Sequence, residues 1–131
     1  MKRTATVAEA VEKMIAANCG AVLISNDAKS LEGIFTERDL MAKVVSGRRD
    51  PDVTLLESVM NENPPSLSDR SSIAEAIHVL KTNQIRHLPV LNDDRELVGM
   101  ISLRHLLYDH ITDLLEEIRS LEAYFNDAPG G

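Results

Sequence analysis

The sequence lacks most of the features that tie a chain to an oxidising or membrane setting. Its 131 residues include one cysteine, Cys19, so no intrachain disulfide can form. We expect that side chain to pack as a small apolar group in a reducing compartment. The chain opens without a signal peptide, and no apolar run approaches the roughly 18 residues that a membrane span requires. The sequence therefore predicts a cytoplasmic protein with no membrane partner.

Positive charge and catalytic motifs are scarce as well. The chain carries 14 Lys and Arg against 21 Asp and Glu, a net charge of −7. This balance opposes the attraction that a nucleic-acid polymer would require, although a single small anion in a local basic pocket remains allowed. There is no nucleophile elbow, phosphate-binding glycine loop or paired-cysteine motif. The sequence thus predicts that the protein is not an enzyme.

What the sequence does contain is an internal repeat. Val7–Val11 recurs as Ile73–Ile77, and Leu31–Leu40 recurs as Leu97–Leu106, both at an offset of 66 positions without a gap. Two copies, rather than three or more, argue against an open solenoid. Neither half, at roughly 60 residues, would bury much core alone. We therefore expect two half-domains that share an interface, where small molecules tend to bind.

Each copy predicts the same order of elements. Apolar residues at helical spacing predict helices from Val7 and from Ile73, each opened by a capping box that begins at Thr6 or Ser72. Two short apolar runs with an Asn-Asp turn between them then predict a hairpin in each copy, and a second helix follows the hairpin directly. The expected strands cover residues 21–25 and 31–36, then 88–91 and 97–102, and the second helices begin near residues 37 and 103.

The connection between the copies has its own pattern. Residues 46–52 contain glycine and proline and predict an exposed loop, and residues 55–60 could form a short helix. Residues 64–67 are expected to form the first strand of the second copy, because proline biases the residue before it towards extended conformations. The equivalent strand of the first copy would lie before Met1, so the first copy is expected to lack it.

The end of the chain has heptad periodicity. Apolar residues follow one another at spacings of 4, 3, 4, 3 and 4, namely Leu107, Ile111, Leu114, Ile118, Leu121 and Phe125. This predicts a long amphipathic helix that ends in residues 126–131. Two interpretations stay open: the helix folds onto its own domain, or it docks on another subunit.

Candidate chemistry lies where the hairpin of the first copy turns into a helix, at Gly33–Asp39. The hydroxyl of Thr36, the free amides of the following helix and the charge of Arg38 together suit a phosphate. Asp39 suits the paired hydroxyls of a ribose. Thr36 and Asp39 also have the spacing of a helix cap, so this segment alone leaves a purely structural role open.

The order and spacing of these elements resemble those of the CBS domain pair, or Bateman module. The resemblance covers nearly the whole chain, including the Gly-x-x-Thr-x-x-Asp turn at 33–39, the lead-in that ends in Val59-Met60, and Ile85–Val90 in the second copy. It implies an α/β fold in which two β-α-β-β-α units pack through their sheets around a pseudo-twofold axis. The first domain would cover residues 1–50, the second 51–110, and the amphipathic helix and tail 111–131.

The resemblance also implies a function. CBS pairs commonly bind AMP, ADP, ATP or NAD in two clefts and act as sensors without catalysis, so an adenosine nucleotide, most of all AMP, is the expected ligand and no other cofactor is expected. Carried over residue by residue, the first cleft would comprise Thr36, Arg38 and Asp39, with Pro65, Ser66 and Leu67 beside the base and Arg86 and His87 near the phosphates. The second, weaker cleft would keep Ser102 and Arg104, but His105 stands where an acidic ribose ligand is usual.

Several alternatives remain beside this interpretation. Arg86 and His87 could form only an exposed turn. His105 and Asp109 share a helical face near His110, yet two convergent ligands are too few to predict a metal site. The rival function is a protein-interaction or dimerisation module with empty clefts that works through the heptad helix. In either case the helix and the family favour a homodimer.

Overall fold

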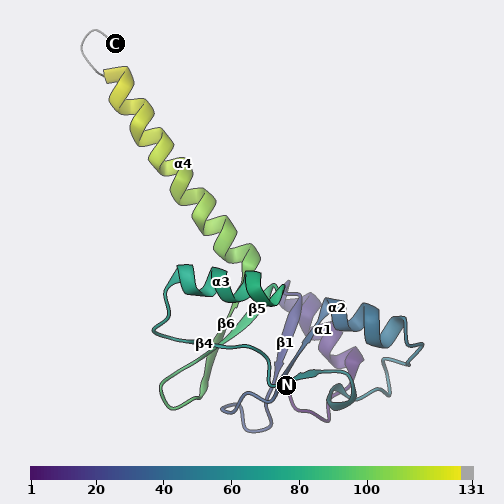
Figure 1. Ribbon diagram of the computed structural model, residues 1–131. Coiled ribbons are helices and arrows are strands. Elements are labelled where there is room, and N and C mark those ends of the chain that lie inside the picture. The colour runs from purple at the N-terminus through teal and green to yellow at the C-terminus, as the bar shows by residue number, and fades with distance from the viewer. Residues whose placement is uncertain (128–131) are drawn as a thin grey trace.

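A computed structural model describes residues 1–127 of the chain. The first unit contains α1 (Val7–Ala17), β1 (Ala21–Ile24), β2 (Gly33–Thr36), α2 (Glu37–Asp39) and a π-helical segment η1 (Leu40–Val45). A 3-10 turn η2 (Leu56–Ser58) and β3 (Asn61–Glu62) lead into the second unit, which contains β4 (Leu67–Ser68), α3 (Ile73–Asn83), β5 (His87–Leu91), β6 (Leu97–Ser102) and α4 (Leu103–Asp127). The predicted α/β fold with two related units is confirmed (Figure 1).

Both predicted hairpins form. β1 pairs antiparallel with β2, β5 pairs antiparallel with β6, and the strand ends differ from the predicted ones by one or two residues. Local apolar runs and turn residues were sufficient for this prediction because a hairpin is specified by neighbouring sequence. The two sheets have the orders β1-β2-β3 and β4-β5-β6.

The predicted helix caps form to different extents. Thr6 caps α1 with a complete capping box, in which its side chain accepts from the Glu9 amide and the Glu9 carboxylate accepts from the Thr6 amide. Ser72 accepts from the Glu75 amide in the same way, but the return bond from the Glu75 carboxylate is not formed. The capping box predicted at Ser72 is therefore only half correct.

The first strand of the second unit is confirmed, and its counterpart has a trace in the first. β4 runs parallel to β5, with Leu67 beside Val90. Met1, which lies 66 positions before Leu67, takes the same place beside β1. Its amino group donates to the Leu23 carbonyl at 2.9 Å, and its carbonyl accepts from the Ser25 amide at 2.8 Å. Met1 thus occupies the last position of that strand, the one equivalent to Leu67.

Each unit has a separate core, and the chain between them closes only the first. In the first core, Val7, Ile24, Phe35, Val44 and Leu56 are fully buried. After η1 the chain turns back, so that the Val7 amide donates to the Thr54 carbonyl at 2.9 Å and Leu55 bridges to Thr6. The smaller second core is built on Leu67, Ala76, Leu80 and Leu88.

Helix α4 leaves the body of the molecule. Figure 1 shows it projecting from the second unit as a single long helix, in contact with α3 and β6 at its base. At its start, Leu103 and Leu106 pack against the second core, whereas the large apolar side chains from Leu107 to Leu121 are exposed, with fractions from 43% at Leu114 to 73% at Tyr108. Folding of this helix onto its own domain, one of the two sequence interpretations, is wrong for the described residues beyond Leu106. The Phe125 side chain and residues 128–131 lie outside the described part.

Candidate functional site

The turn from β2 into α2 forms the predicted helix cap. The Thr36 amide donates to Oδ2 of Asp39 at 2.9 Å, and the Asp39 amide donates to the Thr36 hydroxyl at 3.3 Å. The hydroxyl in turn donates to the same Oδ2 at 2.9 Å. A hydroxyl has one hydrogen to donate, so Thr36 can donate to an anion only if that hydrogen leaves Asp39. The pair thus forms the helix cap that the sequence allowed. A ligand anion would have to compete with Asp39 for the Thr36 hydrogen.

The amides of this first turn are mostly taken. The Glu37 amide donates to the Gly20 carbonyl at 3.0 Å, and the Asp39 amide is held by Thr36. The prediction that the helix start offers a set of free amide donors is wrong for these two residues, because Thr36 and the Gly20 carbonyl, just before β1, satisfy them. Anion binding here would depend on side chains, of which Arg38 is exposed and adjacent.

The Asp39 carboxylate is buried and held from two further directions. Asn61 on β3 donates from Nδ2 to Oδ2 at 2.8 Å, and the Lys43 ammonium lies 3.4 Å from Oδ1. Lys43 also donates to the Val59 carbonyl at 3.1 Å and to Oδ1 of Asn61 at 2.9 Å. Only 9% of the Asp39 side chain is exposed. Oδ2 therefore has three donors, while Oδ1 has a single cation beside it and keeps acceptor capacity.

The second unit reaches this turn through His87. Gly20 allows the approach, since a Cβ built on it would lie 3.2 Å from Cε1 of His87 and 3.0 Å from Cδ of Glu37. Burial lowers the pKa of His87; the carboxylate of Glu37 acts in the opposite direction, and Arg86 lowers the pKa further. His87 therefore lies at the junction of the two units beside the start of α2, and its role near a phosphate stays a prediction.

The remaining predicted residues of the first cleft are not joined to the turn. Leu67 is buried in β4, whereas Ser66 is half-buried and Pro65 and Arg86 are exposed. Within residues 1–127, no hydrogen bond or ion pair connects these four residues to the turn at 36–39. Their role beside a base or a phosphate stays a prediction.

The second candidate cleft has a similar backbone but different side chains. Ser102 accepts from the His105 amide at 3.1 Å, as Thr36 does from Asp39. Arg104 and His105 are exposed on the first turn of α4. The side-chain bonds that surround Asp39 have no counterpart at His105 among the described residues. The weaker binding expected at this second cleft stays a prediction.

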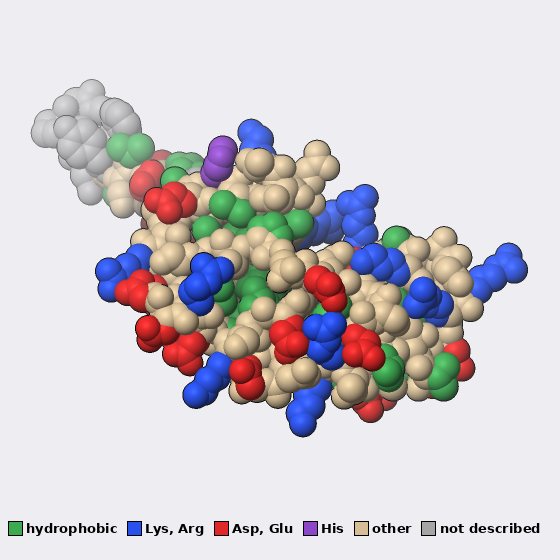
Figure 2. Space-filling model, turned by 60° about the horizontal axis from the view of Figure 1, so that its bottom comes forward, with side chains coloured by type: hydrophobic (Ala, Val, Ile, Leu, Met, Phe, Trp, Pro, Cys, Tyr) green, Lys and Arg blue, Asp and Glu red, His purple; other side chains and the backbone are tan. Residues whose placement is uncertain are grey.

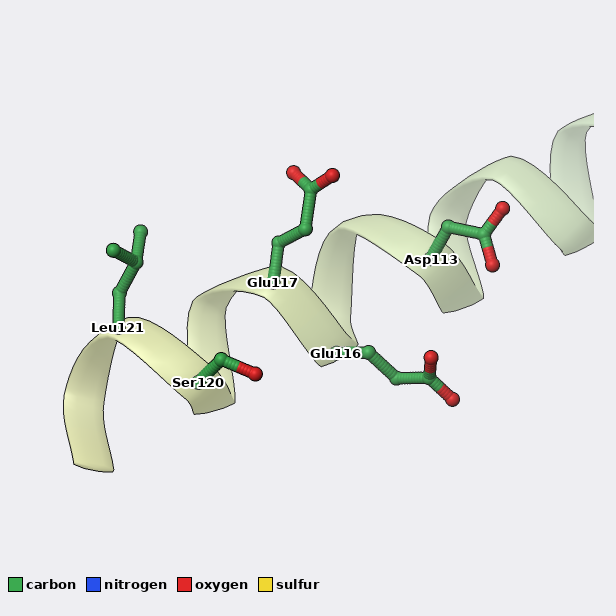
Figure 3. A pocket seen from close by; sticks show the side chains of 5 residues that line it. All are labelled: Asp113, Glu116, Glu117, Ser120 and Leu121. Carbon is green, nitrogen blue, oxygen red and sulfur yellow. The ribbon is translucent and has the colours of Figure 1, made fainter. Parts of the chain in front are cut away.

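Other surfaces offer weaker candidates. A shallow hollow along α4 is lined by Asp113, Glu116, Glu117, Ser120 and Leu121, all from one exposed helix, and its three carboxylates diverge (Figure 3). Such a surface does not enclose a small molecule. In the described part of the chain, no three His, Cys, Asp or Glu side chains gather in a way that could hold a metal ion. None of the described helices is long and apolar enough to cross a membrane.

Charges of both signs mix on the surface. On the face shown in Figure 2, basic and acidic side chains are interspersed, and hydrophobic side chains gather near its centre. One cluster illustrates the mixing: Arg3 contacts Glu32 at 3.3 Å and Glu62 at 3.0 Å. Neither sign of charge forms an extended field on this face.

Sequence reasoning missed three residues of the site. Lys43 could have been found, because it follows Asp39 by four positions on a predicted helix, the spacing of an ion pair. Asn61 gave no signal, since its contact with Asp39 spans 22 positions. Gly20 gave no signal either, because its contacts with Glu37 and His87 join segments that are distant in the sequence.

Comparisons with known proteins agree with this architecture. The family model for the CBS domain matches the chain twice, over residues 2–46 and 56–109. An uncharacterised protein, YlbB, from Bacillus subtilis is 33% identical over 101 residues, which are 76% of this chain and 67% of that protein. A CBS domain-containing protein of Arabidopsis thaliana is 33% identical over 107 residues, but this chain spans 19% of its length. An uncharacterised protein of Methanopyrus kandleri is 32% identical over 104 residues, and this chain spans 53% of it.

Two solved structures are similar to this chain over most of its length. A protein with CBS domains from Burkholderia ambifaria has a TM-score of 0.79 and 31% identity, with coverage of 86% of this chain and 81% of that one. A CBS domain protein from Pyrobaculum aerophilum, solved in complex with AMP, has a TM-score of 0.74 and 26% identity, with coverage of 86% and 89%.

The chain therefore belongs to the CBS domain family, and it holds two copies of that domain. It has the architecture of a CBS pair regulatory module. None of the relatives and structures named above is described as a catalyst.

Proposed function

We propose that this chain is a non-catalytic regulatory module that binds one adenosine nucleotide, AMP ahead of ADP, ATP or NAD, in the cleft of Thr36, Arg38 and Asp39. The observation that carries the proposal is the meeting of the two units at this turn, where His87 of the second unit lies against Gly20 and Glu37 of the first. A polar turn with an acidic side chain, closed by a second unit, has the mixed lining that a nucleotide requires. The AMP complex of the Pyrobaculum relative supports the choice of ligand.

The roles of the side chains follow from their chemistry. Oδ1 of Asp39 would accept from a ribose hydroxyl, because that oxygen keeps acceptor capacity. Arg38, together with Arg86 and His87 of the second unit, would meet the phosphate, since a guanidinium matches the geometry of phosphate oxygens. Pro65, Ser66 and Leu67 would lie beside the base.

Calorimetry with AMP and with adenosine tests the proposal directly. We expect one AMP per chain, and an increase in melting temperature with AMP, because a ligand selective for the native state stabilises it by mass action. Arg38→Ala should weaken AMP far more than adenosine, since it removes only a phosphate contact. Two equivalent sites, or no binding of any of the four nucleotides, would contradict the proposal.

A second role is favoured by α4. We infer that the chain forms a homodimer through its exposed apolar stripe, because burial of such side chains is the main driving force for association. Leu114→Asp should shift the chain towards monomer by placing an unpaired charge in the contact. Sedimentation over a range of concentrations measures this, with Ser120→Asp on the polar side of the same helix as the matched control. A wild-type chain that stays monomeric at high concentration would refute the homodimer and leave the nucleotide site standing.

A further inference from the structure

The carboxylate of Asp39, on α2, is oriented by Asn61 on β3. Three donors already meet Oδ2, from the Thr36 amide, the Thr36 hydroxyl and Nδ2 of Asn61. A carboxylate offers about four lone pairs in all, two on each oxygen. Oδ2 is therefore saturated, and Oδ1 is the oxygen with capacity for another donor. The two oxygens belong to one rigid carboxylate, so the groups that hold Oδ2 also determine the direction in which Oδ1 points.

Asn61 is well suited to fix it, because its own position does not depend on Asp39. Its backbone is held by the pairing of β3 with β2, where it lies beside Ile34. Its side-chain oxygen accepts from the Lys43 ammonium at 2.9 Å, so both ends of the amide are bonded. An amide bonded at both ends has little freedom to rotate and keeps its NH₂ group directed at the carboxylate.

The Thr36 bonds alone do not provide this restraint. They come from Thr36, the N-cap residue of the same turn, so they would follow any local movement of the turn. Asn61 belongs to the segment that leads on to Pro65 and Ser66, the predicted base-side residues. The restraint thus connects Asp39, the candidate ribose-binding residue, to the strand that precedes Pro65 and Ser66, the candidate base-binding residues.

We propose that Asn61 is a positioning residue of the nucleotide site. It holds Oδ2 of Asp39 so that Oδ1 accepts from the ribose hydroxyls, and it acts through Asp39 without touching the ligand. This inference rests on the function proposed above. The second unit has no equivalent arrangement, because His105 replaces Asp39 and Asp109 replaces Lys43.

The test separates ribose recognition from general weakening. Affinities for AMP and for 2′,3′-dideoxy-AMP are measured by calorimetry on the wild type and on Asn61→Ala. The two ligands share base and phosphate and differ only in the hydroxyls. We expect Asn61→Ala to weaken AMP about tenfold, equivalent to one charge-assisted hydrogen bond, and to leave the dideoxy ligand within about twofold. Glu62→Ala, on the same strand, is the control and should change the ratio of the two affinities little.

A second variant keeps the inference open to refutation if Asn61→Ala folds poorly. Lys43→Met removes the ammonium that holds the Asn61 amide while keeping the apolar stem, and it should reduce the preference for AMP in the same direction. Equal losses for both ligands in both variants would show that Asn61 and Lys43 only support the fold, and would overturn the inference alone. Failure of the wild type to bind AMP would overturn the nucleotide site and this inference together.

Discussion

The same position is buried in one unit and exposed in the other. Val7 and Ile73 both follow the cap of the first helix in their unit, yet Val7 is 0% exposed and Ile73 is 65% exposed. In the first unit the chain turns back after η1 and lays Thr54 to Leu56 over the start of α1. In the second unit the equivalent residues remain inside α4. A related element order therefore yields a closed core in one unit and an exposed helix face in the other.

Two residues favour this divergence. Gly47 allows the chain to leave the helix, because a Cβ there would lie 2.5 Å from the Lys43 carbonyl oxygen, and Pro51 cannot continue a helix. The equivalent positions of the second unit are Asp113 and Glu117, which a helix accepts readily. The comparison teaches that helix-breaking residues, rather than the core residues themselves, decide which unit is covered.

The largest expected effect concerns the equivalent residues Val7, which is buried, and Ile73, which is exposed. Val7→Asp places a charge in the closed core without a partner and should lower the free energy of unfolding by about 3 to 5 kcal/mol. Ile73→Asp, at the equivalent exposed position, should change it by no more than about 0.5 kcal/mol. Urea denaturation at low protein concentration measures both. Similar losses for the two variants would mean that the face of α3 is covered in solution.

A second comparison concerns the two candidate clefts. Asp39→Ala should cost roughly 1.5 to 3 kcal/mol of AMP affinity, the usual size for hydrogen bonds to a charged group. His105→Ala should change the affinity little, because a histidine accepts at one nitrogen when neutral and at none when protonated. Calorimetry on both variants checks this. AMP binding indifferent to Asp39→Ala would remove the ribose role from that side chain.

A matched pair of glycines sharpens the comparison of the sheets. Gly33 on β2 has the Met60 sulfur 2.8 Å and the Asn61 carbonyl oxygen 2.9 Å from a Cβ built on it, whereas Gly99 has nothing within 4 Å. Gly33→Ala should therefore destabilise the chain by about 1 to 3 kcal/mol through overpacking. Gly99→Ala, at the equivalent position, should be close to neutral. Thermal unfolding of the two variants gives the answer, and equal effects would contradict the packing described for β3.

The smallest effect is a pH dependence of stability. Burial lowers the pKa of His87 in the folded chain, so the unfolded chain binds a proton first as the pH falls below about 6.5. The contribution of His87 to stability is thus complete above that pH and is lost as the pH falls towards its folded pKa. His87→Gln should flatten this part of the curve of unfolding free energy against pH, while His78→Gln on exposed α3 serves as the control. An unchanged curve in His87→Gln would assign the dependence to other groups.

The sequence predicted what local patterns encode. The hairpins, the Thr6 cap and the Thr36–Asp39 turn all depend on residues within a few positions of one another, so spacing and turn chemistry were sufficient. The parallel strand at Leu67 followed from the repeat and the prolines. These elements specify the two-unit fold almost completely.

What the sequence could not provide depends on contacts between distant segments. The bond from Asn61 to Asp39 exists only because β3 pairs with β2, and the amides of the first turn are occupied because Gly20 lies beside Glu37. The π-helical turns at Leu40–Val45 have no local signature that distinguishes them from an α-helix. The heptad pattern fixed the apolar face of α4 but not its direction, since periodicity describes a face and not a docking partner.

A small tilt at the base of α4 produces a large displacement at its far end. Its first amide, from Leu103, donates at 2.7 Å to the carbonyl of Arg86, the residue before His87. With 25 residues and a rise of about 1.5 Å each, the helix is a rod of roughly 37 Å. A tilt of about 10° at the base would move the far end by roughly 6 Å, as follows from that length. The residue before His87 is therefore also the attachment point of this helix, and small angular displacements there are magnified at its far end.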